Sequence, residues 1–141
     1  MTHTRLETDW GGDFILSSQV WTTSRDLARL GLLHLADGVW DGERLLEEGW
    51  VDYASTPAPA QPPLEGEDGS SLPGYGAQWW LFDRAPGLPA DTFAALGNRG
   101  QVLMVLPSRK LVIVRRGYDM AGGDRFRSAE FAAAVLEALD S

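Results

Sequence analysis

The sequence predicts an α+β fold, in which an antiparallel sheet is covered by one helix from the N-terminal half and another at the C-terminal end. Residues 23–37 repeat apolar side chains at helical spacing. Residues 101–106 and 111–116 are β-branched or apolar runs joined by a short turn. Residues 124–139 are again helical in pattern. A helix followed by strands and a second helix is typical of this class.

The composition fits one globular unit spanning residues 1–141, with 44% hydrophobic residues and 23% charged residues. Twelve basic and 20 acidic residues give a net charge of −8, which argues against nucleic acid and anionic membranes as partners. There is no cysteine, so disulfides and thiolate chemistry are excluded. No apolar run is long enough for a membrane span, and no signal peptide is visible. We therefore expect a soluble protein, cytoplasmic or periplasmic.

The first helix is the best supported element. Leu27, Leu30 and Leu33 fall on one face, and further apolar residues widen that face. Thr23 or Ser24 is placed to cap the N-terminus, and a glycine follows the last turn.

The segments between the helices follow from turn residues and β composition. Asp41-Gly42 between apolar pairs predicts a tight hairpin. Five prolines in residues 55–74 predict a mobile loop inserted in the unit. Residues 75–82 and 92–96 add strands, for three or four in all.

The last helix, over residues 124–139, is rich in alanine and apolar side chains. Phe131, Val135, Leu136 and Leu139 are expected on one side of it, with the alanines packing closely. This side would cover the sheet.

The usual catalytic arrangements are missing from the chain. The only lysine is Lys110, and Pro107 stands three residues before it, so there is no Ser-x-x-Lys. No tyrosine opens a Tyr-x-Asn. His34 lies inside the first helix, where a packed histidine is the simpler interpretation, and no metal ligand set or phosphate loop is recognisable. We expect no cofactor and no metal.

One candidate site remains, the segment Gly97-Asn98-Arg99-Gly100-Gln101 at the start of a strand. Its glycines allow the backbone to approach a ligand. The N–H groups of an edge strand are able to hold a developing negative charge, as an oxyanion hole requires. An ordinary glycine-bracketed hairpin turn explains the same residues. The six tryptophans allow a third interpretation, a surface that binds a glycan or protein, although core packing explains Trp79 and Trp80 as well.

Two long stretches, taken together, resemble the β-lactamase-related serine hydrolases, which join class C β-lactamases, penicillin-binding-protein-like esterases and 6-aminohexanoate-dimer hydrolases. The first runs from Thr22 to Val51 and holds the predicted helix and hairpin. The second includes Gly74-Tyr75-Gly76, Trp79-Trp80, Gly97 to Gln101, and Leu111 to Gly117. The resemblance covers nearly all of the chain, in order. It implies the C-terminal part of the serine β-lactamase and penicillin-binding-protein fold.

The resemblance also implies roles for individual residues. Asn98-Arg99-Gly100 is similar to the third motif of the family, Lys-Thr-Gly or a variant, and Gln101 then takes the position whose backbone N–H helps to form the oxyanion hole. Asn98 stands where a lysine or histidine is usual. The stretch Ser18-Gln19-Val20-Trp21 is similar to a segment lining one wall of the family's substrate pocket.

The function implied is ester or amide hydrolysis through an acyl-serine, on a small-molecule substrate. This chain would supply the oxyanion strand and a pocket wall, but neither the nucleophile nor its base, so we expect it to be inactive alone. A separate chain would supply the missing N-terminal half, or the chain is a truncated product. The alternative is a non-catalytic α+β interaction domain that binds a protein or glycan through exposed tryptophans.

Overall fold

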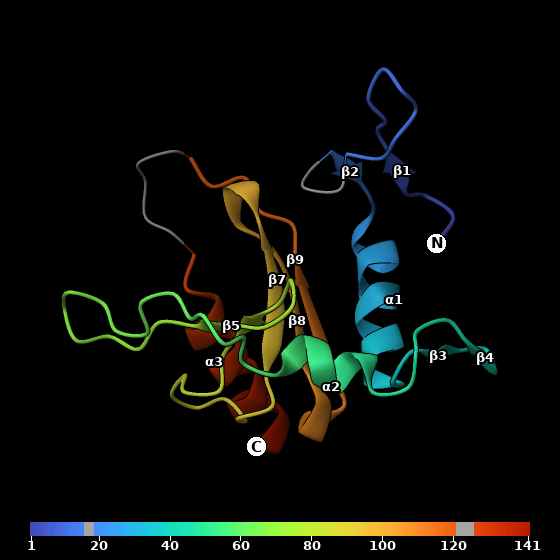
Figure 1. Ribbon diagram of the computed structural model, residues 1–141. Coiled ribbons are helices and arrows are strands. Elements are labelled where there is room, and N and C mark those ends of the chain that lie inside the picture. The colour runs from blue at the N-terminus through green and yellow to red at the C-terminus, as the bar shows by residue number, and fades with distance from the viewer. Residues whose placement is uncertain (16–18, 121–125) are drawn as a thin grey trace.

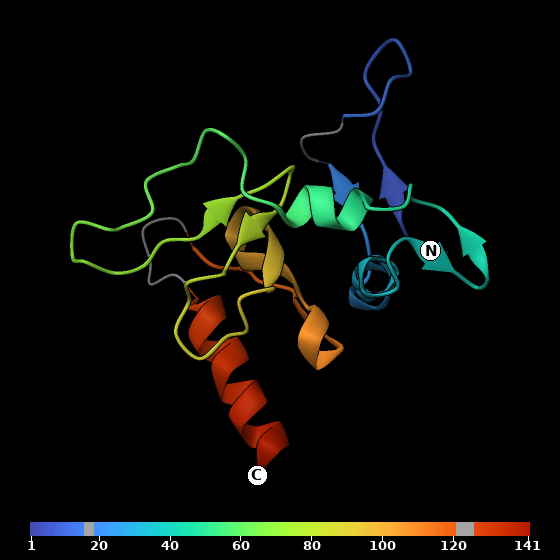
Figure 2. The same ribbon diagram turned by 60° about the horizontal axis from the view of Figure 1, so that its bottom comes forward.

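A computed structural model describes residues 1–15, 19–120 and 126–141, and it confirms the α+β class. A five-stranded antiparallel sheet has the order β5-β6-β7-β8-β9, with α1 on one face and α3 on the other (Figures 1 and 2). The sheet strands are β5 (Gly74–Tyr75), β6 (Trp80–Leu81), β7 (Phe93–Gly97), β8 (Gln101–Leu106) and β9 (Leu111–Arg115). The α-helices are α1 (Ser24–Leu35), α2 (Trp50–Ser55) and α3 (Ser128–Asp140).

Two short hairpins flank α1. The predicted one is formed by β3 (Val39–Trp40) and β4 (Glu43–Arg44), and its turn residues Asp41 and Gly42 have φ values of 51° and 83°. Positive φ at both central residues is the geometry that favours an Asp-Gly pair. The second is formed by β1 (Arg5–Leu6) and β2 (Val20–Trp21), in the segment that precedes α1.

Helix α1 begins as predicted. The Thr23 hydroxyl accepts a hydrogen bond from the backbone N–H of Asp26 at 3.2 Å, which satisfies one of the free donors of the first turn. Gly31 faces the sheet, where a Cβ would come within 2.6 Å of the Val112 side chain on β9. The absence of a side chain at this position therefore sets how closely α1 packs on the sheet.

The aromatic stretch at residues 75–82 forms parts of two strands, so the sheet has five strands where three or four were expected. The backbone turns back because the N–H of Gly76 donates to the carbonyl of Trp79 at 2.8 Å. A side chain at Gly76 would collide with the carbonyl of Ala54 on α2. A glycine in a short aromatic run is the sequence signal for this turn.

Helix α3 differs from its prediction in two ways. It begins at Ser128, and the preceding described residues, Phe126 and Arg127, are not helical. Its buried face is formed by Ala132 and Leu136, while Phe131 and Leu139 are exposed. The helix is apolar over more of its circumference than it buries, so periodicity alone selected the wrong centre for the packed face.

The sheet separates two apolar clusters. On the α1 face, Trp79, Phe93 and Leu103 pack with α2 and the apolar side of α1. On the α3 face, Phe82, Met104 and Leu136 form the second cluster, and Trp80 packs against it. The neighbouring tryptophans thus point to opposite faces, as strand alternation requires.

Candidate oxyanion turn

The candidate site is the turn that connects β7 to β8. Asn98 to Gly100 form a single 3₁₀-like turn, and Gly97 at the end of β7 pairs with Gln101 at the start of β8. Arg99 has φ 57° and ψ 33°, and Gly100 has φ 74°. A left-handed conformation at a non-glycine residue costs free energy and persists only where the surroundings hold it.

The segment that follows β9 holds this turn. Arg115 donates from Nη1 to the carbonyl of Gly100 at 2.8 Å, and its guanidinium is bound by the carboxylate of Asp119 at 2.6 and 3.1 Å. The backbone N–H of Asp119 donates to the carbonyl of Arg99 at 3.1 Å. The hydrogen bond from Arg115 lowers the pKa of Asp119, although burial acts in the opposite direction. The ion pair is therefore maintained at neutral pH.

Glycine is required at two positions where this segment meets the turn. A Cβ at Gly100 would collide with the Arg115 guanidinium and the Asp119 carboxylate. A Cβ at Gly117 would collide with the carbonyl oxygens of Arg99 and Gly100. Sequence reasoning found Gly100 but missed Arg115 and Asp119, because their partners are backbone carbonyls 15 and 20 residues earlier in the chain.

Gln101 connects the turn to the sheet. Its side chain donates from Nε2 to the carbonyl of Gly117 at 2.5 Å, and its Oε1 is buried with no hydrogen-bond partner in the described part of the chain. The expectation that this strand lies at a sheet edge is wrong, because β8 is paired with β7 on one side and β9 on the other. The backbone that leaves the sheet is the turn itself, from Asn98 to Gly100.

The polar side chains of the turn face solvent. Asn98 and Arg99 are exposed, and the Arg99 guanidinium lies 4.7 Å from the ring centroid of Tyr118. This places a cation beside the turn, held by an aromatic face. The structure therefore brings together four of the predicted site residues, Asn98, Arg99, Gly100 and Gln101.

The three remaining predicted site residues come from the N-terminal segment. Ser18 lies outside the described residues, and Gln19 is exposed with φ 62°. Trp21 on β2 is exposed, and its Nε1 donates to the Glu7 carboxylate at 2.8 Å. Arg116, in the segment that holds the turn, donates to the carbonyl of Thr22 at 2.8 Å. The β1–β2 hairpin and the turn thus lie at the same end of the molecule (Figure 1).

A small hollow lies where these segments meet. Its volume is about 460 Å³, and Trp21 and Arg116 are among the residues that line it. No residue from Asn98 to Gln101 lines the same hollow. The described residues therefore provide a wall and a turn that lie near one another without sharing a closed pocket.

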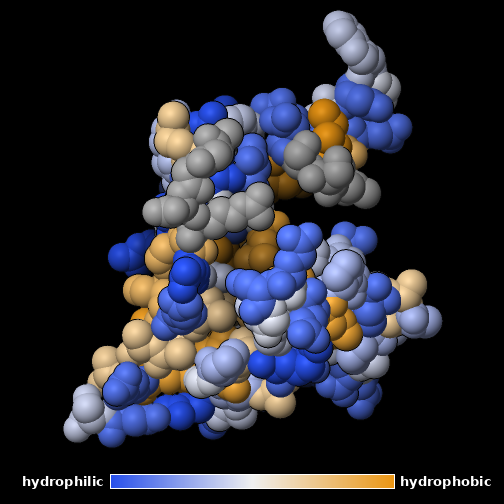
Figure 3. All heavy atoms as spheres, turned by 90° about the vertical axis from the view of Figure 1, so that its left-hand side faces the viewer, coloured by the Kyte–Doolittle hydropathy of each residue, from blue (hydrophilic) through white to orange (hydrophobic). Residues whose placement is uncertain are grey.

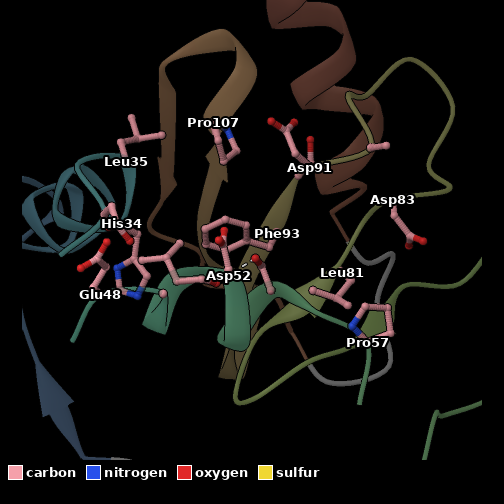
Figure 4. A pocket seen from close by; sticks show the side chains of 16 residues that line it. His34, Leu35, Glu48, Asp52, Pro57, Leu81, Asp83, Asp91, Phe93 and Pro107 are labelled. Atoms are coloured by element: carbon pink, nitrogen blue, oxygen red, sulfur yellow. Dashed lines mark hydrogen bonds between the residues drawn. The ribbon is translucent and has the colours of Figure 1, made fainter. Parts of the chain in front are cut away.

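A different cavity, of about 720 Å³, lies at the opposite end of the sheet (Figure 4). It is lined by His34 and Ser55 together with five acidic residues, Asp37, Glu48, Asp52, Asp83 and Asp91. Carboxylates in this number oppose the build-up of negative charge that acyl transfer produces. The cavity is therefore a poor place for an oxyanion.

Ser55 and His34 do not form a nucleophile–base pair in this cavity. The Ser55 hydroxyl donates to the carbonyl of Val51 at 2.8 Å, and His34 donates from Nδ1 to the carbonyl of Leu30 at 2.9 Å. The His34 ring packs against Trp79 with 4.6 Å between ring centroids, and burial lowers the pKa of His34. The interpretation of His34 as a packed helix residue is confirmed. Among the described residues, no group of three or more His, Asp or Glu side chains is placed to hold a metal ion.

Comparisons with known proteins identify a partial relationship. No protein-family model matches the chain. It is 30% identical over 112 residues to a 6-aminohexanoate-dimer hydrolase from Paenarthrobacter ureafaciens, a match that covers 78% of this chain and 28% of that enzyme. A solved structure from Bacillus anthracis, provisionally assigned as a 6-aminohexanoate-dimer hydrolase, superposes with a TM-score of 0.63 at 26% identity, over 96% of this chain and 32% of that protein.

The chain is therefore homologous to the C-terminal part of 6-aminohexanoate-dimer hydrolase, a serine hydrolase of the β-lactamase family, and spans about a third of the length of these relatives. The sequence resemblance is confirmed to this extent. In the described part of the chain, no helix has the combination of length and apolar character needed to cross a bilayer.

Proposed function

We propose that the chain is the oxyanion-bearing part of a serine hydrolase similar to 6-aminohexanoate-dimer hydrolase. The parent reaction is hydrolysis of an ester or amide through an acyl-serine. The observation that supports this most directly is the β7–β8 turn, which Arg115 and Asp119 hold in a left-handed conformation at an accessible end of the sheet. Partial homology to such an enzyme supports acyl transfer to a serine as the reaction in which the turn takes part.

The chemistry asked of this turn is electrostatic. When a serine attacks the substrate carbonyl, the oxygen gains negative charge, and backbone N–H groups that are already oriented stabilise it at little reorganisation cost. We assign this role to the N–H of Gln101, the residue that pairs with Gly97 where β8 begins, so the role requires this N–H to exchange its partner on β7 for the substrate oxygen. Asn98 supplies an amide for hydrogen bonding to substrate, and Arg99, fixed over Tyr118, adds positive charge nearby. Ser18, Gln19 and Trp21 contribute a wall of the substrate pocket.

Alone, the chain is expected to have no esterase activity, because it contains no Ser-x-x-Lys. The measurement is incubation of the purified chain with p-nitrophenyl acetate. We expect release of p-nitrophenol at the background rate. Turnover above background that a serine-directed phosphonate abolishes would show that the chain carries its own nucleophile, and would refute this assignment.

The role of Gln101 is tested in a complex with the remaining part of the Bacillus anthracis protein, supplied by co-expression. Gln101 has φ −70°, so proline fits its backbone while removing the N–H. Gln101→Pro is expected to lower kcat by roughly 10²–10³-fold, the effect of losing one oxyanion donor. Gln101→Ala keeps the N–H and removes only the bond to Gly117, so it serves as the matched control. Equal losses in both variants would assign the effect to the side chain.

A second candidate function is an interaction domain. Four of the six tryptophans are exposed, namely Trp10, Trp21, Trp40 and Trp50, and aromatic side chains of this kind bind glycans and proteins. Titration with soluble cell-wall glycan fragments, followed by tryptophan fluorescence, distinguishes the two proposals. A saturable change that Trp21→Ala and Trp40→Ala abolish, with no activity in the complex above, would favour the interaction domain.

A further inference from the structure

Helix α3 has a second apolar face besides the one it buries on the sheet. Ala132 and Leu136 pack on the sheet, whereas Phe131 is 46% exposed and Leu139 is 64% exposed. Val135 and Ala138 occupy the same arc as Phe131 and Leu139, at helical spacings of three and four residues. We call these four residues the outer stripe of α3. Figure 3 shows apolar surface gathered over this part of the molecule.

The outer stripe is turned away from the loop on the other flank of α3. The hollow between α3 and residues 86–89 is lined on the helix by residues that include Glu130, Ala133, Ala134 and Glu137, and by none of the four residues of the outer stripe. Phe131 contacts Phe126 with 5.4 Å between ring centroids, and the Arg115 guanidinium lies 4.0 Å from the Phe126 ring. The stripe therefore continues to the end of β9.

Strand β9 is itself incomplete. Within the described residues it pairs only with β8, so one side of Leu111–Arg115 has no strand beside it. Four of its five residues are leucine, valine or isoleucine. A β-branched edge strand with unpaired backbone groups is a template for a further strand.

Helix α1 also presents an apolar residue beside this edge. Gly31 faces Val112 on β9, and His34 points toward Trp79 and Phe93, over the middle of the sheet. Leu32 lies on the flank of α1 away from His34 and is 45% exposed. Figure 2 shows β9 between α1 on one side and α3 on the other. Leu32 on α1, the unpaired side of β9 and the outer stripe of α3 therefore lie toward the same edge of the sheet.

We propose that this surface, formed by Leu32, the free edge of β9 and the outer stripe of α3, is where the remaining two thirds of a hydrolase of this kind docks. The proposal rests on the proposed function. The surface includes residues of α1, of the sheet edge at β9 and of α3. The occupant therefore has to supply a strand that pairs with β9 and apolar helices on both faces of that strand. A short peptide would cover only the strand. The relatives possess more than two thirds of their length beyond the matched part, which is enough polypeptide for all three layers.

A second copy of the chain is a poorer fit for the same surface. In a symmetric antiparallel pairing of two β9 strands centred on Ile113, Lys110 of one copy would lie opposite Arg116 of the other at both ends of the ladder. Like charges placed directly opposite one another destabilise strand pairing. Each copy also carries a net charge of −8. The chain alone is therefore expected to be monomeric.

The experiment is co-expression of the chain with the part of the Bacillus anthracis protein outside the matched third, followed by size-exclusion chromatography with light scattering. We expect a 1:1 complex, weakened at least tenfold by Leu139→Glu and by Phe131→Glu. Both side chains are exposed, so the variants should keep the circular dichroism of the native chain. Tyr53→Glu is the matched control, since Tyr53 is exposed on α2. The carbonyl of Ala54 on the same helix accepts from the N–H of Ala77, which lies between β5 and β6 at the edge of the sheet opposite β9.

Each outcome decides the proposal. Loss of the complex in the two α3 variants, but not in the control, supports it. It is overturned by a failure to form a complex, by a complex that both α3 variants leave unchanged, or by a homodimer of the chain that these variants dissociate. Ester hydrolysis by the complex is measured separately. A complex that forms without hydrolysing ester leaves the docking surface standing and contradicts the proposed function.

Discussion

Helices α1 and α3 cover opposite faces of the same sheet, but they differ in how fully the rest of the chain satisfies and covers them. The N-terminus of α1 is capped by Thr23 and anchored by Asp26, a fully buried carboxylate that accepts hydrogen bonds from the His3 N–H at 2.7 Å and the Thr4 hydroxyl at 3.1 Å. Helix α3 has no side-chain cap and leaves its outer stripe exposed. The N-terminus of α1 is therefore suited to contact with solvent, whereas the outer stripe of α3 leaves apolar side chains in water.

The anchoring of α1 shows how a buried charge is accommodated. Burial acts to raise the pKa of Asp26, but the hydrogen bonds from His3 and Thr4 and the interaction with Arg29 outweigh it, so the pKa is lowered. The carboxylate stays charged and holds the N-terminal segment on α1. No comparable polar contact covers the outer stripe of α3 within the described residues.

The largest difference is expected between two leucines of α3. Leu136 is 6% exposed in the sheet-facing cluster, so Leu136→Ala should cost about 3 kcal/mol of the free energy of unfolding. Leu139→Ala removes the same atoms from an exposed position and should cost less than about 0.5 kcal/mol. Urea denaturation followed by tryptophan fluorescence measures both values.

This pair also tests the assignment of the two faces. Similar losses in both variants would mean that the outer stripe is already covered in the isolated chain. The contrast between the helices would then disappear, and with it the basis for a docking surface.

A smaller effect is expected where α1 approaches the sheet most closely. Gly31→Ala places a methyl group 2.6 Å from Val112 and 3.0 Å from Leu103, a clash that should cost about 2 kcal/mol. Alanine returns up to about 1 kcal/mol through its helix propensity. The net loss of about 1 kcal/mol should appear as a lower urea midpoint.

The matched variant on α3 is Ala138→Leu, which adds a larger side chain to the outer stripe. Since nothing covers that stripe in the described chain, the urea midpoint should stay within about 0.5 kcal/mol of the native value. A loss as large as that of Gly31→Ala would indicate an unrecognised contact at Ala138.

Local patterns in the sequence predicted those parts of the fold that local residues determine. The Thr23 cap, the Asp41-Gly42 hairpin and the runs that became β8 and β9 each carry their own signal, and all are confirmed. The prediction of the packed face of α3 was wrong, because an alanine-rich helix is apolar over most of its circumference. Which face is buried then depends on its neighbours, which the pattern does not contain.

The candidate site was predicted only as a segment. Gly97 to Gln101 were identified from composition and resemblance, and the structure places them in one turn. The ion pair of Arg115 and Asp119 was missed, since its contacts to the carbonyls of Gly100 and Arg99 depend on how β9 folds back along β8. The prediction that β8 lies at the sheet edge was wrong for the same reason, because β9, which pairs with its outer side, follows later in the sequence.

The smallest predicted effect is the pH dependence of the free energy of unfolding that His34 causes. His34 is a buried titratable residue of α1, and α3 has no such residue among its described positions. Burial lowers the pKa of His34, because the interior disfavours the imidazolium. The unfolded chain therefore binds a proton more readily, with a pKa near 6.5, and the stabilising contribution is complete above that value and lost as pH falls through it. The free energy of unfolding should decrease between pH 7.5 and 5.5, with a slope below about 1.4 kcal/mol per pH unit, the limit for one proton.

The control for this effect is His34→Met, which keeps an apolar side chain of similar size against Trp79 and Phe93 but does not titrate. Its urea midpoint should vary less over the same two pH units. The lowered pKa of Asp26 acts only in more acidic solution, as the pH falls below about 4, so the two contributions are separated in pH. If both proteins lose stability equally between pH 7.5 and 5.5, the titrating group lies elsewhere and His34 does not set the acid limit of α1.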